Sequence, residues 1–448
     1  MSNDCPAILI AAPASGQGKT TVTAALARLH ARQGRKVRVF KCGPDFLDPY
    51  WLSLASGAPV YQLDLWMTGE VDCRSRLTAA AQEADLILVE GVMGLFDGTP
   101  SAADLARRFG LHVLAVVDVS AMAGTFGAMA FGLQHYQSDL PWAGVLANRV
   151  AGEGHADMLR DSLNKPQDWL GALMRNPALV LPERHLGLTV ASEVPDALAR
   201  LDAAAEALAD TPLGRMTLDD LQRWSTGFLP VEDGQAHTAP QLLRGKVIAV
   251  ARDAAFCFIY TANLDCLQAM GAELRFFSPL ANEALPACDA LWLPGGYPEL
   301  HADTIAAATR TRSSIEQHIA TGRPVWAECG GMMVLLDTLL TVDGQSHTQW
   351  GLLPGVVSMH QRLAALGPQQ LTLPSGTLRG HTFHFSTTAT TMQAVTRTAP
   401  PDTAVANGAG EALWQQGSVR ASYFHAWFPS SPATVAELFS VSAGEAAC

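Results

Sequence analysis

The sequence predicts an α/β protein with two domains, each containing a largely parallel sheet. Short β-branched runs alternate with Ala/Leu-rich amphipathic segments, and this alternation stops in a polar, Pro- and Gly-containing stretch before it starts again. A chain of 448 residues is also long enough for two or three domains of ordinary size. We therefore expect one domain at 1–228, a linker at 229–244 and a second domain at 245–448.

The first domain is predicted from strand-like runs that alternate with helical segments. We expect helices at about 19–33 and 202–224, and a buried strand and helix in the weakly polar stretch 111–133. Ligands of such a sheet bind at the carboxyl ends of its strands. The strand-like runs are 7–12, 36–41, 85–90, 112–119 and 143–150.

The second domain repeats the pattern and then changes character after residue 350, where Thr, Ser and Gly become frequent. We expect strands at 246–251, 273–278, 290–293 and 324–328, with helices at about 263–270, 303–320 and 332–340. Two further strand-like runs, 377–386 and 418–428, contain the histidines discussed below.

Composition and charge exclude several classes of partner. The formal charge is −12, from 30 Lys and Arg against 42 Asp and Glu, and no basic cluster interleaved with aromatic residues is present, so we do not expect a nucleic-acid partner. The longest weakly polar stretch is interrupted by His112 and Asp118, which argues against a membrane span. The N-terminus lacks the basic region of a signal peptide, and we expect a cytoplasmic protein.

The sequence AAPASGQGKTT follows the first predicted strand and opens a helix, which is the setting of a phosphate-binding loop. Glycines let backbone N–H groups approach phosphates, the lysine reaches the β and γ oxygens, and the threonine hydroxyl binds Mg²⁺. Pro13 stands where the usual motif has its first glycine. We predict ATP as the ligand, held by Gly16, Gly18, Lys19, Thr20 and Thr21.

Carboxylates follow two other strands of the first domain. Glu90 ends one strand and is the predicted partner of Mg²⁺, together with Thr20, because acids at neighbouring strand ends bind the metal in P-loop enzymes. Asp45 is the second candidate for the metal. Asp48 and Asp97, considered alone, have the sequence surroundings of turn residues.

The sequence RPVWAECGGMMVL predicts a nucleophile elbow around Cys329. A strand ends at the cysteine, and the following glycine pair permits a sharp turn into a helix. Such a turn exposes the nucleophile, and the N-terminus of a helix lowers the pKa of a thiol. The N–H of Gly330 is one predicted donor of an oxyanion hole, and Gly296, in a second glycine pair, is the other. The remaining cysteines show no C-x-x-C pair or zinc-site spacing, and we expect most of them to be reduced and structural.

A catalytic cysteine needs a base, and His381, His384 and His425 lie at plausible strand ends. Of these, His425 is our choice. The two sites together predict coupled chemistry, in which ATP converts a carboxylate to an acyl phosphate and the thiol releases ammonia from glutamine to attack it. The product is an amide.

Several long motifs in fixed order resemble the cobyrinic and hydrogenobyrinic acid a,c-diamide synthases over almost the whole chain. The resemblance implies an N-terminal P-loop domain like that of dethiobiotin synthetase and a C-terminal triad-type, class I-like glutamine amidotransferase domain. It also implies a ligase of cobalamin biosynthesis that amidates the a and c acetates of a corrinoid acid with ATP, Mg²⁺ and glutamine. P-loop ligases of this kind often form homodimers, but the sequence leaves the oligomeric state open. The motifs are KTT, KCGPDFLDP, EGVMGLFDG, PERHLGL, LPGGYPEL, WAECGG and SYFHAWF.

The resemblance also assigns roles to individual positions. It places nucleotide and Mg²⁺ binding on Gly18, Lys19, Thr20 and Glu90, adenine recognition on Asn148, and the nucleophile and base on Cys329 and His425. Asp45, Asp48 and Asp97 match acidic positions associated with the substrate and the acyl phosphate.

The chain departs from the pattern beside its predicted base. Triad amidotransferases commonly carry His-x-Glu, but here Trp427 occupies the third position, and the family often has Glu where Thr382 stands. The sequence therefore does not identify the residue that orients His425, and an imidazole without such a residue is a weaker base.

Three other functions were considered for this sequence. Cobyric acid synthase shares the architecture, but KCGPDFLDP differs from its motif; a CTP-synthase-like enzyme would carry His-x-Glu. A non-catalytic P-loop regulatory protein with an inactive thiol domain is disfavoured by the intact ECGG and PGGYPE motifs. The sequence leaves open whether the corrinoid contains cobalt.

Overall fold

The computed structural model describes residues 3–184, 187–229, 239–401 and 410–440. The chain divides into two compact units, Met1–His237 and Thr238–Cys448, and the division falls inside the predicted linker. Part of that linker (230–238) and two positions of the PERHLGL motif (185 and 186) lie outside the described residues. No helix in the described ranges is long and apolar enough to cross a membrane.

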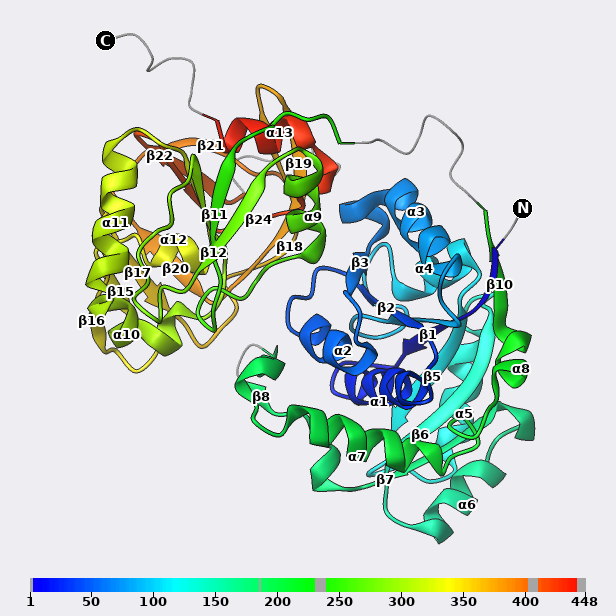
Figure 1. Ribbon diagram of the computed structural model, residues 1–448. Coiled ribbons are helices and arrows are strands. Elements are labelled where there is room, and N and C mark those ends of the chain that lie inside the picture. The colour runs from blue at the N-terminus through cyan, green and yellow to red at the C-terminus, as the bar shows by residue number, and fades with distance from the viewer. Residues whose placement is uncertain (1–2, 185–186, 230–238, 402–409, 441–448) are drawn as a thin grey trace. The chain divides into compact units, whose positions relative to one another are not determined.

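The first unit is built on a sheet with the strand order β3-β2-β4-β1-β5-β6-β7, in which all neighbours run parallel, and β10 pairs antiparallel with β1 (Figure 1). The strands are β1 (Asn3–Ala11), β2 (Val37–Cys42), β3 (Tyr61–Leu63), β4 (Leu86–Glu90), β5 (His112–Asp118), β6 (Trp142–Val150), β7 (Trp169–Met174) and β10 (Ser225–Phe228). A separate two-stranded ribbon pairs β8 (Glu183–Arg184) with β9 (Gly187–Leu188).

Helices cover both faces of this sheet, because its side chains alternate between two apolar clusters. Ile8 and Ile10 of β1 pack with α1, α2 and α7, whereas Leu9 packs on the other face with α3, α4 and α5. The helices are α1 (Lys19–Arg32), α2 (Asp48–Ser56), α3 (Glu70–Ala81), α4 (Ala102–Phe109), α5 (Thr125–His135), α6 (Glu153–Asp161), α7 (Ala197–Ala209) and α8 (Leu218–Leu221).

The second unit has a sheet with the strand order β12-β11-β13-β14-β23-β22-β21, parallel from β12 to β23 and antiparallel beyond. Its strands are β11 (Val247–Ala251), β12 (Glu273–Phe277), β13 (Ala290–Leu293), β14 (Val325–Glu328), β21 (Ala394–Arg397), β22 (Ala412–Gln416) and β23 (Val419–Ser422). Its helices are α9 (Thr261–Ala269), α10 (Ala302–Ala307), α11 (Thr309–Ala320), α12 (Gly330–Met333) and α13 (Pro432–Leu438).

Two smaller sheets complete the second unit. One contains β15 (Thr338–Leu340), β16 (Ser346–Thr348), β17 (Val356–Met359) and β20 (Ser386–Ala389). The other contains β18 (Ala365–Leu373), β19 (Gly376–His384) and β24 (His425–Ala426). The sheet of β18, β19 and β24 matters for function, because β19 carries His381 and His384 and β24 carries His425, the three histidines considered as the base.

Three predicted helices are wrong in extent. The helix expected at 332–340 ends at Met333, because N–H groups of residues 350–353 bind the carbonyls of residues 334–336 that a longer helix would need. The segment 202–224 breaks after α7, where Pro212 lacks the N–H to continue it. The segment 303–320 is two helices, divided at Ala308.

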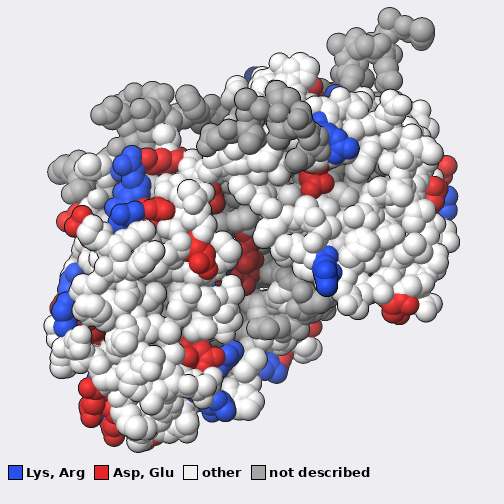
Figure 2. All heavy atoms as spheres, turned by 180° about the vertical axis from the view of Figure 1, so that it is seen from behind, with Lys and Arg blue, Asp and Glu red and all other residues white. Residues whose placement is uncertain are grey.

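Charged side chains are dispersed over the face shown in Figure 2, where basic residues lie singly or beside acidic ones. The described residues include exposed ion pairs, such as Arg38 with Glu83 and Arg160 with Asp157. Pairs of this kind contribute little to stability.

Candidate functional site

The loop between β1 and α1 depends on two glycines with left-handed backbones, Gly16 (φ 76°) and Gly18 (φ 94°). A Cβ at position 18 would also lie 2.2 Å from Nδ2 of Asn148. Asn148 lies two residues before the end of β6, and its Nδ2 donates to the carbonyl of Gln17 at 2.8 Å. The absent side chain of Gly18 thus lets Asn148 hold the loop, which leaves N–H groups at the start of α1 facing a ligand.

The side chain of Lys19 joins this loop to the segment after β4. Its Nζ donates to the carbonyls of Ala14 at 3.1 Å and Met93 at 2.6 Å. Burial, followed by the neighbouring Lys41 ammonium, lowers the pKa of Lys19 to about 8. The lysine is therefore held by neutral acceptors, which phosphate oxygens are able to replace.

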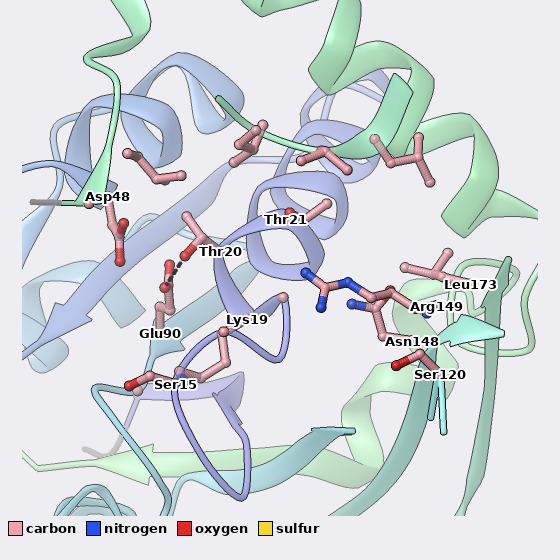
Figure 3. Close-up of a pocket in the computed structure, with 18 of the residues that line it drawn as sticks. Ser15, Lys19, Thr20, Thr21, Asp48, Glu90, Ser120, Asn148, Arg149 and Leu173 are labelled. Carbon is pink, nitrogen blue, oxygen red and sulfur yellow. Dashed lines mark hydrogen bonds between the residues drawn. The ribbon is translucent and has the colours of Figure 1, made fainter. Parts of the chain in front are cut away.

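Thr20 and Glu90 meet at the centre of the site, where Oγ1 of Thr20 donates to Oε1 of Glu90 at 2.7 Å (Figure 3). The other carboxylate oxygen of Glu90, Oε2, is buried and accepts no hydrogen bond from the described residues. Burial raises the pKa of Glu90 to about 8. A hydroxyl and a carboxylate oxygen short of donors fit Mg²⁺, which retains water and phosphate ligands and needs few protein ligands. Among the described residues, no group of three or more His, Cys, Asp or Glu side chains is arranged to hold a metal ion by itself.

Lys41, which we did not predict as a site residue, pairs with the carboxylates here. Its Nζ lies 2.6 Å from Oδ2 of Asp48, 2.9 Å from Oε1 of Glu90 and 3.8 Å from Oδ2 of Asp45. Burial would lower the pKa of Lys41, but these carboxylates raise it well above its ordinary value. The available signal was a lysine at a strand end, directly before the acids of KCGPDFLD.

The three predicted aspartates occupy different environments. Asp45 caps α2 by accepting from the N–H groups of Leu47 and Asp48, and burial beside Asp48 raises its pKa to about 7. Although Asp48 is buried, its pairing with Lys41 lowers its pKa. The carboxylate of Asp97 is exposed and accepts from the N–H of Gly94, so it holds the turn after β4 instead of lining the pocket.

A pocket of about 830 Å³ joins these residues. Glu90, Thr20 and Asp48 lie toward one side of it, and Asn148 and Arg149 lie toward the other (Figure 3). Arg149 has a left-handed backbone (φ 59°), which is uncommon for a residue with a side chain, and pairs with Asp118 at 2.5 Å. Arg149 had no signal in the sequence beyond its place after Asn148.

The second unit contains the predicted elbow. Cys329 has φ 44° and ψ −110°, between β14 and α12, and its N–H donates to the carbonyl of Ser422 at 2.7 Å. A Cβ at Gly330 would lie 2.9 Å from the backbone nitrogen of Gly296. Both residues predicted for the oxyanion hole therefore lie together beside the cysteine.

One expectation about the thiol is wrong. We expected a helix N-terminus to lower the pKa of Cys329, but α12 has only four residues and the side chain is buried. Burial raises the pKa of the thiol above its ordinary range, and the carboxylate of Glu299 adds to this effect. The resting side chain is a thiol.

His425 lies on β24, directly opposite His381 of β19. Its ring contacts the glycine loop: a Cβ at Gly295 would lie 2.5 Å from Cε1 of His425. Burial, together with His381 and His384, lowers the pKa of His425 well below its ordinary value. The loop 295–296 thus contacts both the neutral imidazole and the turn after Cys329.

His384 is engaged at both ring nitrogens. Its Nε2 lies 3.0 Å from Oε1 of Glu411 and its Nδ1 lies 2.8 Å from the carbonyl of Ser386. The hydroxyl of Thr382 donates to the same oxygen of Glu411 at 2.8 Å. Glu411, which sequence reasoning missed, therefore places a carboxylate beside Thr382.

Comparison with known proteins assigns both units. Residues 8–188 match the CobQ/CobB/MinD/ParA nucleotide binding domain, and residues 247–433 match the CobB/CobQ-like glutamine amidotransferase domain. The chain is 55% identical over 439 residues to hydrogenobyrinate a,c-diamide synthase of Pseudomonas aeruginosa, covering 97% of each chain. The chain belongs to the a,c-diamide synthase family.

Other members of the a,c-diamide synthase family match over nearly their full length. The enzyme of Stutzerimonas stutzeri, also named hydrogenobyrinate a,c-diamide synthase, is 56% identical over 441 residues, covering 98% of this chain and 99% of the relative. The cobyrinate a,c-diamide synthase of Herminiimonas arsenicoxydans is 50% identical over 444 residues, covering 98% of each. The predicted fold class, the nucleotide-binding P-loop domain and membership of a family of glutamine-dependent, amide-forming ligases of cobalamin biosynthesis are confirmed.

Gly18→Ala is expected to abolish nucleotide binding, because the new Cβ would collide with Asn148 and the backbone is left-handed. Gly34→Ala is the matched control, since Gly34 also has a positive φ but open space around its Cα. Titration with a fluorescent ATP analogue measures both. Binding by Gly18→Ala equal to that of Gly34→Ala would show that the contact with Asn148 does not constrain the loop.

Lys41→Ala is expected to lower the free energy of unfolding of the first unit by about 3 kcal/mol, because Asp48 and Glu90 would remain buried without their cation. Arg38→Ala, on the same strand and in an exposed pair, should change it by less than about 0.5 kcal/mol. Urea unfolding is monitored through hydrogen exchange of the amides in β2 and β4, so that unfolding of the first unit is measured separately from unfolding of the second. Equal effects of the two variants would contradict the pairing.

Proposed function

We propose that this protein amidates the a and c acetate carboxylates of hydrogenobyrinic or cobyrinic acid, with ATP and glutamine as cosubstrates. The observation that carries the proposal is identity of 50–56% over nearly the whole chain to relatives named for a,c-diamide formation. The proposal divides the chemistry between the units. The first unit activates the carboxylate, and the second supplies ammonia.

In the first unit, a substrate carboxylate oxygen attacks the γ-phosphorus of ATP, ADP leaves, and ammonia then displaces phosphate from the acyl carbon. Lys19, released from its carbonyl acceptors, binds the β and γ oxygens. Thr20 and Glu90 are the proposed Mg²⁺ residues, and the ion would neutralise charge on the transferred phosphoryl group. Asp45 is the second proposed contact for the metal. Lys41 holds Asp48 and Glu90 in place.

Substrate contacts in the same pocket complete this half of the proposal. Asp48 and Asp45 face the pocket where the carboxylate is activated, and Asn148 and Arg149 are placed to receive the nucleotide base at the opposite side. Asp97 acts indirectly, through the turn that it holds after β4.

In the second unit, Cys329 transfers its proton to His425 and attacks the amide carbon of glutamine. The N–H groups of Gly296 and Gly330 stabilise the oxyanion, and His425 returns the proton to departing ammonia. Water then hydrolyses the thioester to glutamate. Because the raised pKa of the thiol and the lowered pKa of the imidazole favour the neutral pair, glutamine hydrolysis without the second substrate should be slow.

Mass spectrometry of products tests the substrate assignment. Purified protein is incubated with ATP, Mg²⁺ and glutamine, and with hydrogenobyrinic and cobyrinic acid in separate reactions. We expect a diamide from at least one of them. A corrinoid a,c-diamide offered as substrate should remain unchanged, and its amidation would instead indicate a cobyric acid synthase type of activity.

Cys329→Ser is expected to reduce glutamine-dependent amidation by at least about 10³-fold while leaving ammonium-dependent amidation unchanged. Cys288→Ser, at another buried cysteine of the second unit, should retain both activities. Product formation at a pH that provides free ammonia measures the difference. Failure of ammonium to restore the product would contradict the division of labour.

Glu90→Gln is expected to reduce amidation with either nitrogen source by at least about 10²-fold, because the neutral amide would not bind the metal. Glu83→Gln, at an exposed acid of the same unit, should behave like the parent. Initial rates across a Mg²⁺ titration measure both variants. Near-normal rates for Glu90→Gln would remove Glu90 from the metal site.

A further inference from the structure

Six aromatic rings follow one another through the thiol site of the second unit. They lead from a tryptophan after β24 to a tyrosine in the loop that carries Gly296. The successive centroid distances are 5.2 Å for Trp427–Tyr260, 6.3 Å for Tyr260–His381, 5.1 Å for His381–His425, 6.0 Å for His425–Phe258 and 5.0 Å for Phe258–Tyr297. The proposed base, His425, is an inner member of this series.

His381 is the neighbour whose plane matches that of the base. The two residues are directly paired between β19 and β24, and their rings are inclined by only 21°. His381 is itself held in place, because its Nδ1 lies 3.1 Å from the hydroxyl of Tyr260. The ring of Tyr260 in turn packs edge-on against the ring of Trp427. Near-parallel, offset rings of this kind attract one another.

The backbone of the glycine loop limits the imidazole as well. Gly295 lies so close to Cε1 of His425 that any Cβ there would collide with it. His425 is thus bounded by a parallel ring from β19, by Phe258 and by this loop. Rotation of the imidazole about its Cβ–Cγ bond would break these contacts.

We infer that His381 is a positioning residue for glutamine hydrolysis, which fixes the plane of the His425 imidazole by stacking so that one ring nitrogen faces the Cys329 thiol. The inference rests on the proposed role of His425 as base. In hydrolases with a catalytic triad, a hydrogen-bonded side chain orients the imidazole. Here the stacked ring of His381 restricts the same rotation. His381 would thus orient His425 in a chain that has Trp427 in the usual position of the triad glutamate.

The surroundings of the two rings keep them uncharged at neutral pH. Burial lowers the pKa of His381 to about 3, and that of His425 also falls well below its ordinary value. The other titratable groups around them are His384 of β19, the Tyr260 hydroxyl and Glu328, whose Oε1 accepts from the N–H of Ala426. A neutral imidazole is the form that accepts the thiol proton.

Substitution of His381 tests the inference. His381→Ala removes the stacked ring, and we expect kcat/KM for glutamine-dependent amidation to fall by about 10- to 100-fold, as for a misplaced catalytic group. His381→Phe replaces it with a flat ring and should recover most of the activity. Ammonium-dependent amidation should be unchanged in both, because it does not use the thiol site.

The pH profile separates positioning from a general loss of structure. His381→Ala also removes part of the burial that lowers the pKa of His425, so this pKa should rise. Since the base must be neutral, the acid limb of kcat/KM for glutamine should move to higher pH in His381→Ala and move less in His381→Phe, which keeps the burial but loses the imidazole of His381. Thermal unfolding of the second unit, followed by tryptophan fluorescence, verifies that both variants are folded.

The outcomes distinguish this inference from the proposed function. Glutamine-dependent activity retained by His425→Ala would overturn the role of the base itself. If His425→Ala is inactive but folded His381→Ala stays within about twofold of the parent, the positioning role is overturned. Phe no better than Ala at position 381, in folded protein, would also overturn it, because stacking is the property that Phe retains.

Discussion

A left-handed backbone at a strand-to-helix turn is the constraint on which both sites depend. Gly18 (φ 94°) opens α1 and Cys329 (φ 44°) precedes α12. In each case the turn follows the carboxyl end of a parallel strand, and under the proposed mechanism its N–H groups bind phosphate in one unit and a developing oxyanion in the other. Glycine meets the constraint without strain, whereas the cysteine adopts it because its own side chain must be presented.

One site contains buried charged groups, whereas the buried thiol and imidazole of the other are neutral. The nucleotide site keeps a buried ammonium, Lys41, between carboxylates, and this arrangement suits a pocket that, under the proposed mechanism, receives phosphates and a divalent ion. The thiol site holds Cys329 and His425 in surroundings that favour their neutral forms. Under the proposed mechanism, the thiolate and the imidazolium do not form in the absence of glutamine, and the preference for the neutral pair keeps glutamine hydrolysis slow.

Features set by local sequence were predictable, and those set by distant partners were not. The glycine loop, the elbow at Cys329 and the strand ends that carry Glu90 and His425 follow from periodicity and turn chemistry. The pairing of Lys41 with Glu90 joins residues 49 positions apart. The helix expected at 332–340 fails because residues 350–353 bind its carbonyls, and the raised pKa of the thiol comes from burial, which no local motif reveals.

The central claim is that the substrate carboxylate becomes an acyl phosphate before ammonia attacks it. The most direct measurement uses a corrinoid acid with ¹⁸O in its acetate carboxylates and follows the label into inorganic phosphate by ³¹P NMR or mass spectrometry. The account predicts one labelled oxygen in phosphate for each amide formed. Amide formation with unlabelled phosphate would contradict it.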